Sequence, residues 1–228
     1  MVYLLHGDNQ TASREFLQEL VSQAEEKNQE LVRLDGLKLE IEDFIQALDS
    51  GSLFGGERTI VVENLFSRPK SKTQERMLDF LNGYGGENQL ILWERKEVGK
   101  RLQKKLPEKT QVKLFKIPVL MFKFLDQLSP YKKTDALKLL SQLLKQESAE
   151  LIFYMLVRQF RLLIQVSDGV KVSGPPWLTG KLKRQAEAFN KDNLLTNYRR
   201  LFTIDESIKT GRTLMGLDWH LDMFLLNL

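Results

Sequence analysis

The stretch Met1-Val2-Tyr3-Leu4-Leu5-His6-Gly7-Asp8 opens the chain and decides the fold of its first half. An apolar run that ends at Gly7-Asp8 is typical of a strand followed by a loop. From about Thr11 to Ala24, apolar side chains recur at helical spacing, with acidic side chains on the other side. The beginning of the chain therefore predicts a strand, a tight loop and an amphipathic helix.

The same alternation continues to residue 117. Short apolar runs predict strands at residues 31–34, 59–62, 90–93 and 112–117, and helical periodicity predicts helices at 41–48 and 74–81. Alternating strands and helices are typical of an open, mainly parallel α/β sheet with helices on both faces. We therefore expect an α/β domain over residues 1–117.

After Pro118 the strand pattern stops and only helical periodicity remains. The predicted helices cover residues 119–128, 134–145, 149–166, 178–189, 194–209 and 217–228. In the fifth of these, the apolar residues Leu194, Tyr198, Leu201, Phe202 and Ile208 fall on one stripe. We expect an all-helical domain over residues 118–228.

Composition excludes several classes of protein. Of 228 residues 42% are hydrophobic and the formal net charge is only +4, which excludes an intrinsically disordered chain. The chain contains no Cys, so disulfides, Cys-based metal sites and thiol catalysis are excluded. Its two histidines, His6 and His220, are far apart in the sequence, and we expect no metal and no cofactor.

Charge and hydropathy bear on location and partners. Residues 119–228 carry 16 basic and 11 acidic residues. This excess fits a solvated helical surface, and a DNA-facing surface is the other interpretation. The chain begins without a secretory signal pattern, and no segment approaches the roughly 20 apolar residues of a membrane span. We therefore expect no membrane association and a cytoplasmic location.

The loop after the first strand is where a nucleotide-binding α/β domain holds phosphate. The Walker A motif G-x-x-x-x-G-K-[ST] needs its glycines for close backbone approach, its Lys for phosphate and its hydroxyl for magnesium. Here Gly7-Asp8-Asn9-Gln10-Thr11-Ala12-Ser13-Arg14 lacks the second Gly and the Lys-[Ser/Thr] pair. The third strand ends at Glu63, a single carboxylate of an ordinary kind. We expect no ATP hydrolysis and no catalytic residue.

Several other residues have simpler interpretations. Asp205 and Lys209 are four apart on one helix, which predicts an ion pair. Arg158 and Arg161 share a helix face, either solvated or in contact with a subunit or DNA. His6 is expected to be a hydrogen-bonded residue at a strand end. The three tryptophans are expected to pack in the core or between domains: Trp93, Trp177 and Trp219.

The stretch Ser50-Gly51-Ser52-Leu53-Phe54-Gly55-Gly56 is the least ordinary in the chain. Leu53 lies about 140° from the apolar stripe of the preceding helix, at 100° per residue. Leu53 and Phe54 are adjacent, and small residues bracket them on both sides. Either the turn folds back and buries them, or they form an exposed hydrophobic plug that the pocket of a partner can hold.

Four stretches carry a family resemblance that runs almost from end to end. They are Tyr3-Leu4-Leu5-His6-Gly7-Asp8, Ser52-Leu53-Phe54-Gly55-Gly56-Glu57-Arg58, Leu156-Val157-Arg158-Gln159-Phe160-Arg161-Leu162-Leu163 and Ile204-Asp205-Glu206-Ser207-Ile208-Lys209-Thr210-Gly211. In this order and spacing, the sequence resembles the delta subunit of bacterial DNA polymerase III, which opens the sliding clamp within the clamp loader.

The resemblance implies an AAA+-like (P-loop NTPase-like) domain that has lost ATP binding, followed by a helical domain that joins a collar of clamp-loader subunits. It implies that Leu53 and Phe54 are the clamp-binding residues, entering a hydrophobic pocket of the clamp and favouring the opened ring. This implication favours the plug over the buried turn.

The resemblance also implies the partners. They are the beta sliding clamp and the gamma/tau and delta prime subunits, in a hetero-oligomer. The chain would be a subunit of a DNA-directed DNA polymerase (nucleotidyltransferase) holoenzyme with no catalytic activity of its own. Contact with primer–template DNA stays open.

The spacing departs from the family pattern at one place. Delta subunits carry a helical lid domain between the α/β and collar domains, whereas here Phe115-Lys116-Ile117-Pro118 leads almost directly into the helices assigned to the collar. We therefore expect a short form without the lid.

Two other hypotheses remain at this point. One is a degenerate AAA+ module that acts as a scaffold or DNA-binding protein outside replication. The other is an ATPase with an unusual phosphate loop.

Overall fold

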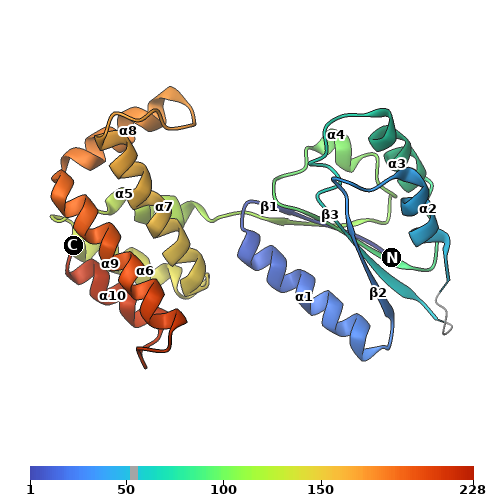
Figure 1. Cartoon of the computed structure of the whole chain (residues 1–228), viewed down its shortest axis with the longest axis horizontal. Helices are drawn as coiled ribbons and strands as arrows, with labels where there is room; N and C mark the ends of the chain where they lie inside the picture. Colours follow the sequence, from blue (N-terminus) through green and yellow to red (C-terminus); the bar gives the residue numbers. More distant parts are fainter. Residues whose placement is uncertain (52–55) are drawn as a thin grey trace. The chain divides into compact units, whose positions relative to one another are not determined.

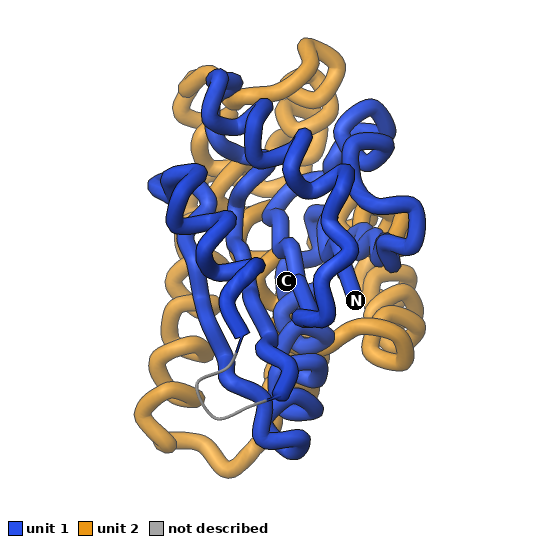
Figure 2. Tube along the Cα trace, turned by 90° about the vertical axis from the view of Figure 1, so that its right-hand side faces the viewer, with its two compact units in different colours: residues 1–117 blue, residues 118–228 orange. Residues whose placement is uncertain are grey.

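The computed structural model describes residues 1–51 and 56–228. The chain divides into two compact units, Met1–Ile117 and Pro118–Leu228, which Figure 2 shows in different colours. Within the described ranges, no helix is both long and apolar enough to span a membrane.

The first unit is built on a five-stranded sheet. Its strands are β1 (Val2–Gly7), β2 (Glu30–Asp35), β3 (Arg58–Glu63), β4 (Gln89–Glu94) and β5 (Gln111–Phe115), in the order β2-β3-β4-β1-β5. All four neighbouring pairs are parallel. The inner strands are apolar on both faces, as parallel strands covered on both sides require. Ile60, Val61 and Val62, for example, are all completely buried.

Helices cover both faces of this sheet. On one face α1 (Gln10–Glu26) packs its apolar side against Leu5, Val61, Ile91 and Trp93. Figure 1 shows α2 (Ile41–Asp49), α3 (Lys72–Asn82) and the short α4 (Lys100–Gln103) on the opposite side. There they enclose a second core with the alternate residues of the same strands, among them Leu4 and Ile60. The predicted parallel α/β sheet is confirmed, and among the described residues of this unit α4 is the one helix that the periodicity did not predict.

The second unit consists of helices alone. They are α5 (Val119–Gln127), α6 (Lys133–Leu143), α7 (Ala149–Ser167), α8 (Pro176–Glu187), α9 (Lys191–Lys209) and α10 (Leu217–Leu226). The central helix is α7, which packs against α5, α8, α9 and α10. The buried Phe160 ring on α7 meets the rings of Phe189 and Phe224 edge-on, at centroid distances of 5.7 and 5.5 Å. The predicted all-helical architecture after Pro118 is confirmed.

The prediction of core packing is confirmed for Trp93 but is wrong for Trp177 and Trp219, for which packing between domains stays a prediction. Trp93 is completely buried, but Trp177 and Trp219 are 65% and 42% exposed. Trp177 lies in the first turn of α8, and the amine of Lys181 lies 6.0 Å from the centroid of its ring. Trp219 lies in the first turn of α10, edge-on to the His220 ring. Near a helix end, a large apolar residue has fewer neighbours to cover it than in the middle of a strand.

Candidate functional site

The loop after β1 lies at the carboxyl edge of the sheet, where a nucleotide site would form. Gly7 has a φ of +137°, and a Cβ atom there would lie only 1.9 Å from the carbonyl oxygen of Phe115. The amide of Asn9 donates to the same carbonyl at 3.1 Å, and the Ile117 amide donates to the Asp8 carboxylate at 2.9 Å. The loop is therefore fastened to the end of β5.

The beginning of α1 is occupied by the chain's own groups. The Asn9 side chain caps the helix by accepting from the Ala12 amide at 3.2 Å. Ser13, at the Walker lysine position, is completely buried. Its hydroxyl donates to the Gln10 carbonyl at 3.1 Å and accepts from the Trp93 indole at 3.2 Å. A side chain held in this way cannot extend to a phosphate group as the lysine of the motif does.

Arg14 stands at the sequence position of the metal-binding hydroxyl of the motif. Its guanidinium donates two hydrogen bonds to the Glu63 carboxylate, at 2.7 and 2.6 Å. It also stacks on the Trp93 ring, with its central carbon 3.5 Å from the ring centroid. These hydrogen bonds, together with the charges of Arg14, Arg33 and Arg95, lower the pKa of Glu63. A fixed side-chain cation thus neutralises the carboxylate at the end of β3.

Two further ionisable groups of this edge hold loops in place. Glu94, at the end of β4, accepts from the Phe66 amide at 2.6 Å and the Ser67 hydroxyl at 2.7 Å, and burial raises its pKa. The Nδ1 atom of His6 accepts from the Val98 amide at 3.0 Å, and burial lowers its pKa. The hydrogen bond predicted for His6 is confirmed for Nδ1, whereas Nε2 has no partner among the described residues.

The predicted clamp-binding residues, Leu53 and Phe54, lie outside the described residues. The chain on either side of them is well anchored. The Arg58 guanidinium pairs with Glu30 of β2 and also donates to the Ser50 carbonyl at 3.4 Å. The Gln29 side chain donates to the Glu57 carboxylate at 2.9 Å. The two ends of the segment are therefore tied to each other and to the edge strand.

An apolar groove of about 600 Å³ lies on the second unit, between α7, α9 and the beginning of α10. We call it the α7–α9 groove. Four of its lining side chains are large, apolar and exposed: Tyr154, Phe202, Ile208 and Met215. Of the predicted stripe on α9, Leu194 and Leu201 are buried, whereas Phe202 is 68% exposed. The apolar stripe of α9 thus contains more residues than the core buries. The surplus apolar residues, such as Phe202, are the feature of the sequence from which the groove could have been predicted.

The structure bears on two sequence predictions about charged residues of the second unit. Asp205 and Lys209 line the groove and form the predicted ion pair, with a nitrogen–oxygen distance of 2.8 Å. On α7, Arg161 is exposed, whereas Arg158 is half-buried beside Trp177 and Lys181 in a hollow of about 250 Å³. Their spacing places the two arginines on one side of α7, as predicted, but only Arg161 is fully exposed.

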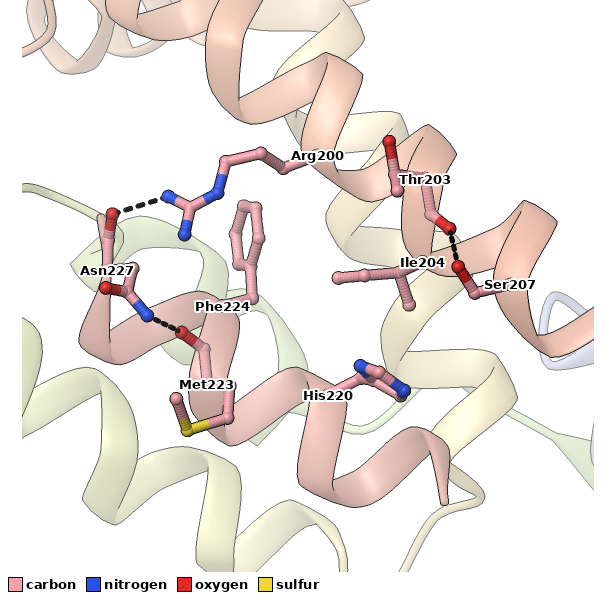
Figure 3. Close-up of a pocket in the computed structure, with 8 residues that line it drawn as sticks. All are labelled: Arg200, Thr203, Ile204, Ser207, His220, Met223, Phe224 and Asn227. Carbon is pink, nitrogen blue, oxygen red and sulfur yellow. Dashed lines mark hydrogen bonds between the residues drawn. The ribbon is translucent and has the colours of Figure 1, made fainter. Parts of the chain in front are cut away.

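Figure 3 shows a smaller pocket of about 310 Å³ between α9 and α10. The Arg200 guanidinium donates to the backbone carbonyl of Asn227 at 2.7 Å, and the side-chain Nδ2 atom of Asn227 donates to the Met223 carbonyl at 2.7 Å. At the other end, His220 Nε2 lies 3.1 Å from the Thr213 hydroxyl. The polar groups of this pocket are engaged with one another, and they hold the end of α10 against α9.

Comparison with known proteins finds matches over both units. The family model described as DNA polymerase III, delta subunit, matches residues 3–123. The model described as DNA polymerase III delta subunit, C-terminal domain, matches residues 120–228. A search of curated proteins finds no match.

Two solved structures are similar. One is the Bacillus subtilis DNA clamp loader delta protein, with 17% identity and a TM-score of 0.48 over 99% of this chain and 94% of that chain. The other is a DNA polymerase III gamma subunit-related protein from Thermotoga maritima, with 14% identity and a TM-score of 0.37 over 99% of this chain and 93% of that one.

Proposed function

Because the chain belongs to the delta-subunit family of DNA polymerase III, we propose that it binds the DNA sliding clamp and opens it for loading onto primed DNA. The observation that carries this proposal is the match of both units, in order, to the two models of one family. The same match favours a role in replication over the hypothesis of a scaffold outside it.

We assign clamp binding to Leu53 and Phe54. The assignment is supported by their adjacency between small residues, and by the anchoring of Ser50 and Arg58 on either side of them. Two neighbouring apolar side chains on a short connection can fill a hydrophobic pocket with few other contacts.

The proposed mechanism is differential binding. A plug that fits the clamp better when one ring interface is open shifts the ring population towards the open state. The shift cannot exceed the difference in binding free energy between the two states, so a tight plug that fits both states equally would open nothing. No bond is made or broken in this step.

We further propose that the chain hydrolyses no ATP and that hydrolysis belongs to the gamma/tau subunits. The Arg14–Glu63 pair, the buried Ser13 and the fastened Gly7 loop support this proposal. On this proposal the chain contributes clamp opening, and not nucleotidyl transfer, to the DNA-directed DNA polymerase holoenzyme, and it works in the cytoplasm.

The α7–α9 groove is our candidate for the collar contact with gamma/tau or delta prime. Its exposed Tyr154 and Phe202 side chains support this role, because aromatic residues with apolar surroundings are typical anchors of protein interfaces.

The experiment that tests the clamp proposal is a binding titration of the full chain with the sliding clamp of the same organism. The double substitution Leu53→Ala, Phe54→Ala should abolish binding while the far-ultraviolet circular dichroism stays unchanged. Leu37→Ala is a suitable control, because Leu37 is an apolar residue of the same unit that is 46% exposed. If the double variant is folded and binds the clamp as tightly as the parent, Leu53 and Phe54 are not the clamp-binding residues.

A second function, DNA binding, is favoured by the excess of basic residues after Pro118. It is tested by titrating the chain with primed DNA at several salt concentrations. Binding of DNA that weakens steeply with salt, in a chain that does not retain the clamp, would favour a DNA-binding module.

A further inference from the structure

One buried side chain contacts both ends of the segment that carries Leu53 and Phe54. Asn88 lies directly before β4 and is 8% exposed. Its Nδ2 atom donates to the carbonyls of Leu48 at 2.9 Å and Ser50 at 3.2 Å. Its Oδ1 atom accepts from the backbone amide of Arg58 at 3.0 Å. A single carboxamide therefore joins the end of α2 to the beginning of β3.

Asn88 is itself held by the sheet. Its carbonyl accepts from the N-terminal amine of Met1 at 3.2 Å, and the amide of Leu90 donates to the Met1 carbonyl at 2.8 Å. These contacts fix the residue between β1 and β4, two inner strands whose apolar residues are buried. The support for the segment thus comes from a central part of the unit.

The chemistry of this contact fits asparagine. The carboxamide offers two donor hydrogens and an acceptor oxygen on a short stem, and all three are needed here. An aspartate would lack the donors, and an alanine would leave the Arg58 amide and the Ser50 carbonyl without this partner. The contact therefore depends on the side chain itself and not merely on the filling of a space.

We propose that Asn88 is a positioning residue for clamp binding. By fixing the chain at Ser50 and Arg58, it lowers the conformational entropy that is lost when Leu53 and Phe54 enter the clamp pocket. This inference rests on the proposed function and adds a residue that does not itself touch the clamp.

The test compares two buried amides of the same unit. Asn88→Ala should weaken clamp affinity roughly tenfold, the size of effect expected from loss of preorganisation. Gln74→Ala is the matched control, because Gln74 is 5% exposed and donates to the carbonyls of Leu65 at 3.1 Å and Arg68 at 3.3 Å, on another loop. It should lose a similar amount of stability and keep the parent's affinity.

Affinities are measured by calorimetry with the full chain and the intact clamp, at a temperature where every variant is folded. If Asn88→Ala does not fold, Asn88→Ser is measured in its place. Equal clamp affinity of the Asn88 and Gln74 variants, whether both are reduced or both unchanged, would overturn the inference.

The Leu53→Ala, Phe54→Ala variant separates the two proposals. If this variant still binds the clamp, the assignment of clamp binding to Leu53 and Phe54 is wrong. If it loses the clamp while the Asn88 variants retain it, only the positioning role of Asn88 fails.

Discussion

Arg14 and Glu63, on α1 and at the end of β3, form a two-pronged ion pair with nitrogen–oxygen distances of 2.7 and 2.6 Å. The pair lies at the carboxyl edge of the sheet and is stacked on the ring of Trp93. The Arg14 side chain belongs to the chain itself and so pairs with Glu63 without any bound ion. At the carboxyl edge of the sheet, this pair serves to hold α1 against the end of β3.

Replacing Arg14 should destabilise the first unit in a pH-dependent way. Arg14→Ala should lower the free energy of unfolding by about 1–2 kcal/mol at neutral pH, because it removes a bidentate pair and a cation–π contact. The pKa of Glu63 is below its usual value of 4.5 in the folded chain. The contribution is therefore present above pH 4.5 and is lost as the pH falls through the folded-state pKa.

Urea unfolding of the parent and of Arg14→Ala at several pH values checks this expectation. Arg14→Lys is the control, because it keeps the charge but cannot form the bidentate pair or stack in the same way. The free energy of unfolding of Arg14→Lys should lie between those of the parent and Arg14→Ala. A stability difference between the parent and Arg14→Ala that does not shrink in acid would contradict the role given to Glu63.

Glu94 should have the opposite pH dependence. Burial raises its pKa, so its ionisation, as the pH rises above the usual value of 4.5, costs stability in the folded chain. Glu94→Gln cannot ionise. The stability of this variant relative to the parent should therefore increase as the pH rises from 4.5 through the folded-state pKa. Urea titrations of both proteins at each pH measure this difference, and a difference that is constant with pH would refute the prediction.

The close approach at Gly7 should make that position intolerant of a side chain. Gly7→Ala should cost about 3 kcal/mol or more, because φ is +137° and the new Cβ would meet the carbonyl of Phe115. Gly85→Ala is the control, since no atom lies within 4 Å of the Cβ that it would add. Thermal unfolding should show a large loss for the first variant and almost none for the second. Similar unfolding temperatures would show that the loop moves away without cost.

ATP binding should be absent from the purified chain. The lysine position of the phosphate loop is a buried serine, and the hydroxyl position is an arginine paired with Glu63. Equilibrium dialysis with radiolabelled ATP and magnesium should give no saturable binding, with a functional P-loop ATPase as the positive control. Stoichiometric binding would restore the hypothesis of an unusual phosphate loop.

Assembly with other clamp-loader subunits should depend on the α7–α9 groove. Phe202→Asp should reduce co-elution with gamma/tau and delta prime by at least about tenfold, because it places a charge at an apolar contact. Phe122→Asp is the control, since Phe122 is also exposed, at 42%, but lies on α5 outside the groove. Both variants should keep the helical circular dichroism of the parent. If Phe202→Asp assembles as well as the parent, the collar contact does not lie at the α7–α9 groove.

Local periodicity predicted most of the secondary structure. The β-branched run at residues 59–62 and the apolar run at 90–93 became the buried strands β3 and β4, and each long helix after Pro118 was predicted within a few residues. Such patterns depend on neighbours in the sequence and can be read without knowing the fold.

Contacts between distant residues could not be predicted in this way. Arg14 and Glu63 are 49 positions apart, and each alone is an unremarkable charged residue. The exposure of Trp177 and the hydrogen bonds of Asn88 likewise depend on which elements become neighbours. The assignment of Leu53 and Phe54 came from the family resemblance, because the residues alone left a buried turn and an exposed plug equally open.

The strand order has a consequence for synthesis of the chain. β1 is made first, yet its partners in the sheet are β4 and β5, with Tyr3 opposite Ile91 and Gln111. One edge of β1 can therefore pair only after β4, which ends at Glu94, has left the ribosome, and the other edge only after β5, which ends at Phe115. Until β4 emerges, the apolar β1 has no native partner, and an unpaired strand is prone to aggregate. The sheet can thus be completed only when nearly all of the first unit has been synthesised.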